Sequence, residues 1–174
     1  LESFFDEKFL ITKFDKNIID CSKKRGIKLF DASQLYEKKC LNEISKLDID
    51  IVLVCTFSFL IPKQILSTAK IAAINFHPSL LPKYRGAIPE ICVIYNGDKK
   101  TGISFHLMTE KFDKGNLILQ RKLEVQDNDT TVSLKKRLSS HARESLKDLF
   151  TIIRLRNLKG EIQKESEASY CKLE

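Results

Sequence analysis

Two polar side chains, Asn75 and His77, follow an apolar run and are the residues of this chain best suited to chemistry. The run at residues 71–74 predicts a buried strand, and alternate residues of a strand point to the same side, so the amide and the imidazole should face one space. Pro78 and Pro82 exclude a regular helix or a central strand after them, which predicts a stiff loop over that space. A strand end capped by local hydrogen bonds would carry the same two residues, and the spacing alone leaves both interpretations open.

A longer motif extends this pair. The twelve residues from Asn75 to Gly86, Asn-Phe-His-Pro-Ser-Leu-Leu-Pro-Lys-Tyr-Arg-Gly, are followed at residues 112–115 by Phe-Asp-Lys-Gly. This pattern resembles the signature of the folate-dependent formyltransferases, which include the methionyl-tRNA, amino-sugar and glycinamide ribonucleotide enzymes. The resemblance implies an α/β fold with an open, mostly parallel, Rossmann-like sheet flanked by helices. It also implies transfer of a formyl group from 10-formyltetrahydrofolate to a primary amine.

Three residues match the catalytic Asn, His and Asp of that family one for one: Asn75, His77 and Asp113. An amine that attacks a formyl carbon generates a tetrahedral oxyanion, which an Asn amide and a protonated imidazole can stabilise. A carboxylate that orients the imidazole or a bridging water completes the proton transfers. We expect Asp113 to raise the pKa of His77. Without the resemblance, Asp113 would be interpreted as a turn residue before Gly115.

The resemblance also implies binding residues. A donor segment should line the pterin cleft, although it could equally be ordinary core between a loop and a helix; it comprises Ser58, Phe59, Leu60 and Ile61. The resemblance also implies that one loop faces the acceptor. This loop comprises Ser79, Leu80, Leu81, Pro82, Lys83, Tyr84 and Arg85. The last three could equally be exposed residues without a role in binding. No metal is expected to take part.

Methionyl-tRNA is the expected acceptor because residues 82–87 and 163–170 resemble that branch most. A nucleotide-linked amino sugar is the alternative, since the Ser-Phe-His sequence at residues 104–106 resembles some sugar and glycinamide ribonucleotide enzymes, and glycinamide ribonucleotide comes third. A catalytically silent folate-binding module is the alternative outside enzymes. Such a module would not need Asn75, His77 and Asp113, and all three are present.

The elements expected around these residues alternate between strand and helix. His106 should lie on the polar face of a half-buried strand as a supporting or surface group, and Ser33 should cap a helix containing Tyr36 and Cys40. The expected helices cover residues 16–25, 33–47, 89–97 and 131–155. The expected strands cover residues 27–30, 51–55, 71–77, 101–108 and 117–125.

Composition is typical of one domain with a sizeable core, since the chain has 174 residues and 43% hydrophobic content. We assign residues 1–159 to a formyltransferase catalytic domain and residues 160–174 to a polar connecting or capping segment. Only residues 1–11 are available for the strand, helix and strand with which such domains begin. The N-terminal elements are therefore expected to be incomplete.

The net charge of +7 is spread over many short groups of Lys and Arg. Solvated helix faces explain such groups best, although tRNA or a nucleotide phosphate is compatible with them. Five cysteines without a close pair indicate neither a disulfide framework nor a zinc site, and Cys55 and Cys92 are expected in the core. With no stretch apolar enough to cross a membrane, we expect a cytoplasmic protein.

Overall fold

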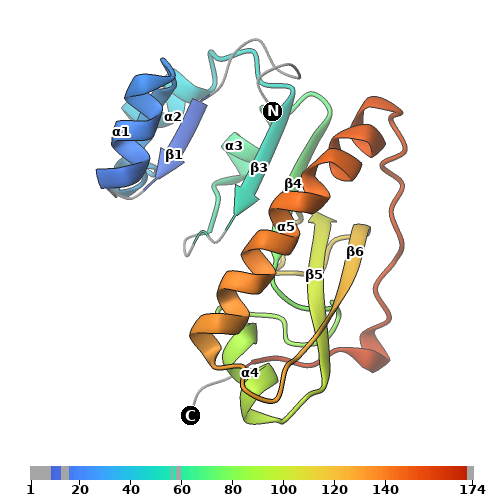
Figure 1. Cartoon of the computed structure of the whole chain (residues 1–174). Helices are drawn as coiled ribbons and strands as arrows, with labels where there is room; N and C mark the ends of the chain where they lie inside the picture. The colour runs from blue at the N-terminus through green and yellow to red at the C-terminus, as the bar shows by residue number, and fades with distance from the viewer. Residues whose placement is uncertain (1–8, 13–15, 56, 58–59, 172–174) are drawn as a thin grey trace. The chain divides into compact units, whose positions relative to one another are not determined.

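A four-stranded sheet carries the predicted site and belongs to one of two units into which the contacts of the chain divide (Figure 1). The computed structural model describes residues 9–12, 16–55, 57 and 60–171. Unit 1 comprises Leu1–Asp48 and Ile61–Thr68, and unit 2 comprises Ile49–Leu60 and Ala69–Glu174. Each unit is described by itself below.

Unit 1 is a strand–helix–strand motif followed by short helices. Strand β1 (Phe9–Thr12) pairs in parallel with β2 (Lys28–Asp31), and helix α1 (Lys16–Lys24) connects them. The helix expected over residues 16–25 ends at Lys24, and Gly26 follows with a φ of 65°, a left-handed conformation that glycine adopts without steric cost. The short helices η1 (Ala32–Gln34), α2 (Lys38–Ile44) and α3 (Lys63–Leu66) complete the unit.

The helix expected from Ser33 onward is wrong in its start. Asp31, not Ser33, is the capping residue, because its carboxylate accepts the Ser33 backbone N–H at 2.8 Å and opens the 3-10 turn η1. Helix α2 begins only after Glu37, so Tyr36 lies outside it and is exposed. Cys40 and Ile44 are buried as their spacing predicts.

Unit 2 contains a mixed sheet with the strand order β3-β4-β5-β6. Strand β3 (Ile51–Cys55) is parallel to β4 (Ala72–His77), whereas β5 (Lys100–Leu107) and β6 (Leu117–Glu124) each run antiparallel to the strand before them. The α/β class is confirmed. The strand directions are more evenly divided than expected, because the strands after β4 return without the crossover that a parallel pair requires.

In the described part of unit 2, two α-helices pack against the sheet or each other. Helix α4 (Pro89–Tyr95) begins at the predicted proline, and α5 (Thr131–Arg154) lies over the sheet in Figure 1. Reciprocal hydrogen bonds between Thr130 and Ser133 cap the start of α5. Its buried side chains recur at helical spacing, and they meet a core from the strands that includes Ile74, Ile103 and Phe105.

Strand β5 differs from the half-buried strand that was expected. Residues 101–106 are all buried, including the polar side chains of Thr101, Ser104 and His106. A buried polar group is stable only when it is hydrogen-bonded, so the face with Ser104 and His106 must have polar partners. His106, expected to be a supporting or surface group, is 2% exposed.

The chain after α5 returns along the sheet as an irregular segment, which we call the strap and define as residues 161–171 (Figure 1). It contains the short helix η2 (Glu165–Glu167). Glu161 exchanges two backbone hydrogen bonds with Leu117, and Cys171 forms a disulfide with Cys92 of α4. The expectation that the cysteines stay unpaired is therefore wrong. Cys55, expected in the core, is exposed at the end of β3.

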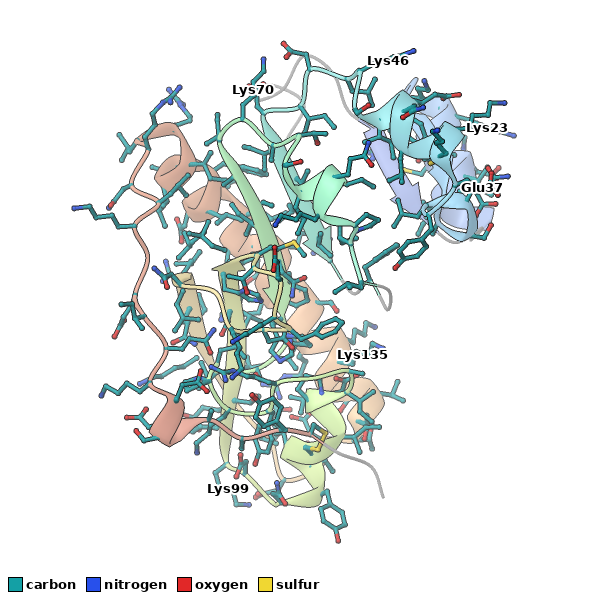
Figure 2. All side chains as sticks on the ribbon, turned by 180° about the vertical axis from the view of Figure 1, so that it is seen from behind. Lys23, Glu37, Lys46, Lys70, Lys99 and Lys135 are labelled. Carbon is teal, nitrogen blue, oxygen red and sulfur yellow. A yellow bond between two sulfur atoms is a disulfide. The ribbon has the colours of Figure 1, made fainter. Side chains whose placement is uncertain are left out.

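The positive charges of unit 2 are dispersed. In Figure 2, Lys70, Lys99 and Lys135 project from separate parts of this unit. This agrees with the interpretation of the charged groups as solvated surface. Among the described residues, no helix combines the length and the apolar character needed to span a bilayer.

Candidate active site

The predicted pair lies at the end of β4. Asn75 and His77 are two residues apart on this strand and therefore share one face of the sheet. The antiparallel register with β5 sets Asn75 beside His106 and His77 beside Ser104. The face thus gathers four polar side chains that the neighbouring strands hold in fixed positions.

Asp113 joins this face from the loop between β5 and β6. Its Oδ1 lies 3.6 Å from Nδ1 of His77 and accepts a hydrogen bond from Nδ2 of Asn75 at 3.4 Å. Its Oδ2 accepts the backbone N–H of Gly86 at 2.9 Å. The three residues that match the family's catalytic set therefore converge on one place, with His77 and Asp113 buried and Asn75 half-buried.

His106 is held in place through both ring nitrogens. Its Nδ1 lies 2.8 Å from the carbonyl of Leu107, so Nδ1 carries a proton and donates it. Its Nε2 lies 3.2 Å from Nδ2 of Asn75 and 3.5 Å from Oδ1 of Asp113. His106 and Asn75 thus both lie against the carboxylate of Asp113. This supporting role was missed because the register that sets Asn75 beside His106 cannot be derived from either strand alone.

His77 is oriented from both ring nitrogens. Its Nε2 donates to the backbone carbonyl of Tyr84 at 2.8 Å, which leaves Nδ1 facing Asp113. Burial lowers the pKa of His77 and outweighs the opposing effects of Asp113 and of the Tyr84 carbonyl. The expected net rise in the pKa of His77 is therefore wrong, although Asp113 acts in the expected direction. The lowered pKa favours the neutral form of His77, in which Nε2 keeps its proton and Nδ1 has a lone pair.

Asp113 remains ionised beside it. Burial alone would raise the pKa of Asp113, but the nearby His106 and His77 and the Gly86 N–H together hold it below its ordinary value. The site therefore combines a fixed carboxylate, a neutral imidazole and an amide donor. This arrangement can accept a proton at Nδ1 of His77 and stabilise the resulting charge.

The loop over the site is held by buried polar groups of the sheet. The Ser104 hydroxyl donates to the carbonyl of Ser79 at 2.6 Å and accepts the backbone N–H of Leu81 at 3.1 Å. Gln120 of β6 donates to the Leu81 carbonyl and to Ser104, each at 2.8 Å. These contacts explain why Ser104 is buried, and neither Ser104 nor Gln120 was assigned to the site from the sequence.

The expected binding residues occupy different environments. In the acceptor loop, two residues are buried, Ser79 and Leu81. Three are half-buried, Leu80, Pro82 and Tyr84, and the Tyr84 hydroxyl donates a hydrogen bond to Asp98. Lys83 is exposed. Arg85 is wholly buried, with 0% exposure. In the donor segment, Leu60 is exposed and Ile61 is buried, whereas Ser58 and Phe59 lie outside the described residues.

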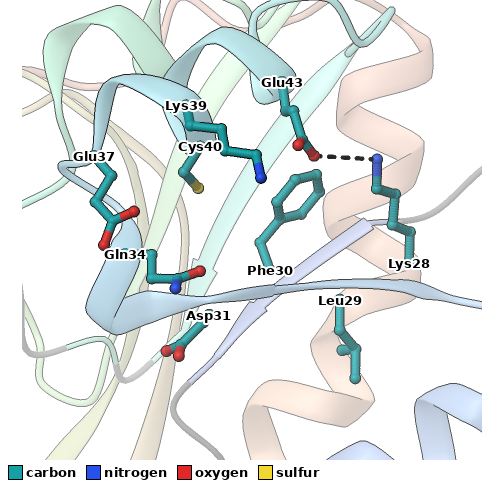
Figure 3. A pocket seen from close by; sticks show the side chains of 9 residues that line it. All are labelled: Lys28, Leu29, Phe30, Asp31, Gln34, Glu37, Lys39, Cys40 and Glu43. Carbon is teal, nitrogen blue, oxygen red and sulfur yellow. Dashed lines mark ion pairs between the residues drawn. The ribbon is translucent and has the colours of Figure 1, made fainter.

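A pocket of about 250 Å³ lies within unit 1, and none of these residues lines it (Figure 3). Charges of both signs line it, and Lys28 pairs with Glu43 at 3.7 Å and lies over the Phe30 ring. Lys28 and Glu43 thus partly neutralise each other at this pocket. Among the described residues, no cluster of His, Cys, Asp and Glu is suited to hold a metal ion.

The fold and the site together define a formyltransferase domain, and comparison with known proteins identifies the family directly. Residues 10–149 match the formyl transferase family, and the chain belongs to it. A methionyl-tRNA formyltransferase of Clostridioides difficile is 34% identical over 85% of this chain and 48% of its own length. One of Mycoplasma mycoides is 38% identical over 75% of this chain and 41% of its own length. The chain thus spans about half the length of these curated relatives.

Solved structures agree on the fold. Phosphoribosylglycinamide formyltransferase from Anaplasma phagocytophilum superposes with a TM-score of 0.76 at 22% identity, over 93% of this chain and 81% of its own. The formyltransferase PseJ from Anoxybacillus kamchatkensis superposes with a TM-score of 0.71 at 25% identity, over 96% of this chain and 86% of its own. The PseJ structure is a complex with UDP-4,6-dideoxy-4-formamido-L-AltNAc and tetrahydrofolate.

Proposed function

We propose that this chain is the catalytic part of an enzyme that transfers the formyl group of 10-formyltetrahydrofolate to the amine of methionyl-tRNA. One observation carries the proposal: Asn75, His77 and Asp113 converge in a chain that belongs to the formyl transferase family. A silent folate-binding module would not need a buried His–Asp pair, since burying such groups without a use is unfavourable.

The hydrogen bonds suggest how the proton moves. The amine must lose a proton as it attacks the formyl carbon, and the lone pair on Nδ1 of His77 can receive it. The ionised Asp113 stabilises the imidazolium that forms, and His77 then returns the proton to the departing folate nitrogen. The Asn75 amide supplies a donor for the developing oxyanion once substrate displaces one of its present acceptors.

The acceptor assignment follows the relatives named methionyl-tRNA formyltransferase. A nucleotide-linked amino sugar is the second candidate, because the match to PseJ covers 86% of that chain rather than about half. Glycinamide ribonucleotide comes third, supported by fold alone. We also propose that residues 58–61, the donor segment, bind the pterin of the folate donor.

The test is formylation by the full-length protein. It should be incubated with 10-formyltetrahydrofolate and either methionyl-tRNA, a UDP- or dTDP-linked amino sugar, or glycinamide ribonucleotide, with tetrahydrofolate release and product mass followed. We expect formyl-methionyl-tRNA, and no product from a His77→Asn variant. Formylation of the amino sugar alone would replace the acceptor, and no product with any amine would overturn the proposal.

Salt dependence gives an independent test of the acceptor. Binding of tRNA should weaken by roughly 0.7 to 0.9 log units per log unit of salt for each phosphate contact, whereas a nucleotide sugar with about two phosphates should give a shallow slope. Lys83 is exposed and free to contact phosphate, so Lys83→Glu should weaken tRNA binding and reduce this slope. Arg85 is not suited to this test because it is buried. An unchanged slope in Lys83→Glu would remove this residue from the tRNA surface.

A further inference from the structure

Arg85 is a wholly buried cation that the proposed proton transfers do not use. Its Nε and Nη2 donate to the side-chain oxygen of Gln163 at 3.2 and 2.8 Å. Its Nη2 and Nη1 also form a two-point contact with the carboxylate of Glu165 at 2.9 and 3.1 Å, and its guanidinium lies beside the Tyr170 ring. The strap thus surrounds this side chain, and lysine could not reproduce its planar set of donors.

Gln163 transmits these contacts to the other side of the site. Its Nε2 donates to the backbone carbonyls of Asp113 at 2.8 Å and Gly115 at 2.7 Å, while its oxygen accepts both bonds from Arg85. The amide has two protons and two acceptor positions, and all four are used. Gln163 therefore has one orientation, and it links the loop at residues 79–86 to the loop at residues 113–115.

The two linked loops each hold a residue in an unfavourable backbone conformation. Tyr84 has a φ of 56° and Asp113 a φ of 53°, a left-handed region that residues other than glycine rarely adopt. Such conformations persist only where surrounding contacts fix them, and they cluster at active sites. The Tyr84 carbonyl binds Nε2 of His77, and the Asp113 carboxylate faces its Nδ1.

The strap supplies backbone contacts at both positions. Ser169 accepts the Tyr84 N–H through its hydroxyl at 2.9 Å and the Arg85 N–H through its carbonyl at 2.9 Å. Gln163 holds the Asp113 carbonyl on the opposite side. The two groups that orient His77 are therefore both fixed from one segment, which follows α5 in the sequence.

We propose that Arg85, acting through Gln163, is a positioning residue that sets the carboxylate of Asp113 against His77. The proposal rests on the proposed function of this site. It gives Arg85 a different role from direct contact with the acceptor. Removing the Gln163 donors should let the Asp113 backbone relax from its left-handed conformation, so that the carboxylate withdraws from Nδ1 of His77.

The test uses Gln163→Met in the full-length protein, since methionine keeps the approximate length of the side chain and lacks both donors. Arg85→Lys is the second variant, which keeps the charge and loses the planar donors. Lys164→Met is the matched control, because Lys164 is an exposed neighbour on the strap that bonds only Glu167 among the described contacts. Circular dichroism and thermal unfolding establish that each variant is folded.

The first measurement is the pKa of His77 by NMR, which needs no turnover and is practical with three histidines in the chain. The groups that act on His77 are Asp113, Glu90, His106 and the Tyr84 carbonyl, and of the two carboxylates only Asp113 should move. Withdrawal of this anion should lower the pKa of His77 in Gln163→Met and, by less, in Arg85→Lys. The control should match the wild type.

The second measurement separates kcat from KM. We expect kcat to fall by about tenfold or more in Gln163→Met with both KM values within about threefold, because positioning acts on the reacting groups rather than on ground-state binding. The limb of the pH–rate profile governed by His77 should move to lower pH. A folded Gln163→Met or Arg85→Lys protein with an unchanged His77 pKa would overturn the proposal. Failure of the proposed function would appear instead as an inactive wild type.

Discussion

The Asp113→Asn substitution isolates the charge beside His77. Asparagine keeps the shape and an oxygen for the Gly86 N–H, so the loop should stay folded. The two interacting atoms are 3.6 Å apart, and the side chains are 5% and 9% exposed. At an effective dielectric constant of about 20, a charge pair at this distance is worth about 4 to 5 kcal/mol. Because 1.36 kcal/mol is a factor of ten in rate, kcat should fall about 10³-fold.

The assay is single-turnover formyl transfer with saturating donor and acceptor, which reports the chemical step rather than product release. The matched control is Asp129→Asn, because Asp129 is also a shielded carboxylate, 2% exposed, that bonds Arg137 and Ser133. The control should lose stability while the folded fraction keeps its rate. A loss below about tenfold in Asp113→Asn would refute the view that Asp113 stabilises charge on His77.

Three further predictions concern stability. Gly115→Ala should lower both stability and turnover sharply, because a Cβ there would lie 1.6 Å from a backbone oxygen of β5. The control is Gly97→Ala, whose Cβ would have nothing within 4 Å. In thermal unfolding the control should lose only about 1–2 kcal/mol, the cost of backbone strain. Reducing the Cys92–Cys171 disulfide should lower the free energy of unfolding by about 2–4 kcal/mol in urea titrations, and a Cys92→Ser variant should show no such change on reduction. Hydrogen bonds from Arg85 lower the pKa of Glu165 to about 2 from 4.5, so the contribution of Glu165 to the free energy of unfolding is present above pH 4.5 and lost as the pH falls toward 2. Glu165→Gln should therefore weaken the dependence of stability on pH in that range. An unaltered acid-unfolding curve would contradict the pairing.

The sequence predicted elements well where the information was local. The apolar run before Asn75 and the proline that opens α4 each indicate an element without reference to distant residues. Strand direction was less accessible, since an apolar run buries equally well in a parallel or an antiparallel pair. The alternation in β5 suggested one solvated face, but loop residues and Asp113 cover that face with hydrogen-bonding groups.

The part of the site that depends on local sequence was predictable as well. Asn75 and His77 follow from strand periodicity, and Asp113 from its motif. The buried position of Arg85 depends on partners 78 and 80 residues away, and the disulfide joins cysteines separated by 79 residues. No local pattern reports such contacts. The lowered pKa of His77 likewise depends on burial, which only the folded chain determines.

The position of the strap along the chain has a consequence for biosynthesis. Asn75, His77 and Asp113 leave the ribosome well before residues 161–171, yet the contacts that hold the loops around them come from that segment. A nascent chain that has just completed α5 would therefore contain all three proposed catalytic residues without the strap's support for Asp113. Contacts of such long sequence separation also form late and slowly in folding. The arrangement of this site should accordingly be acquired only after the strap has been made and has docked.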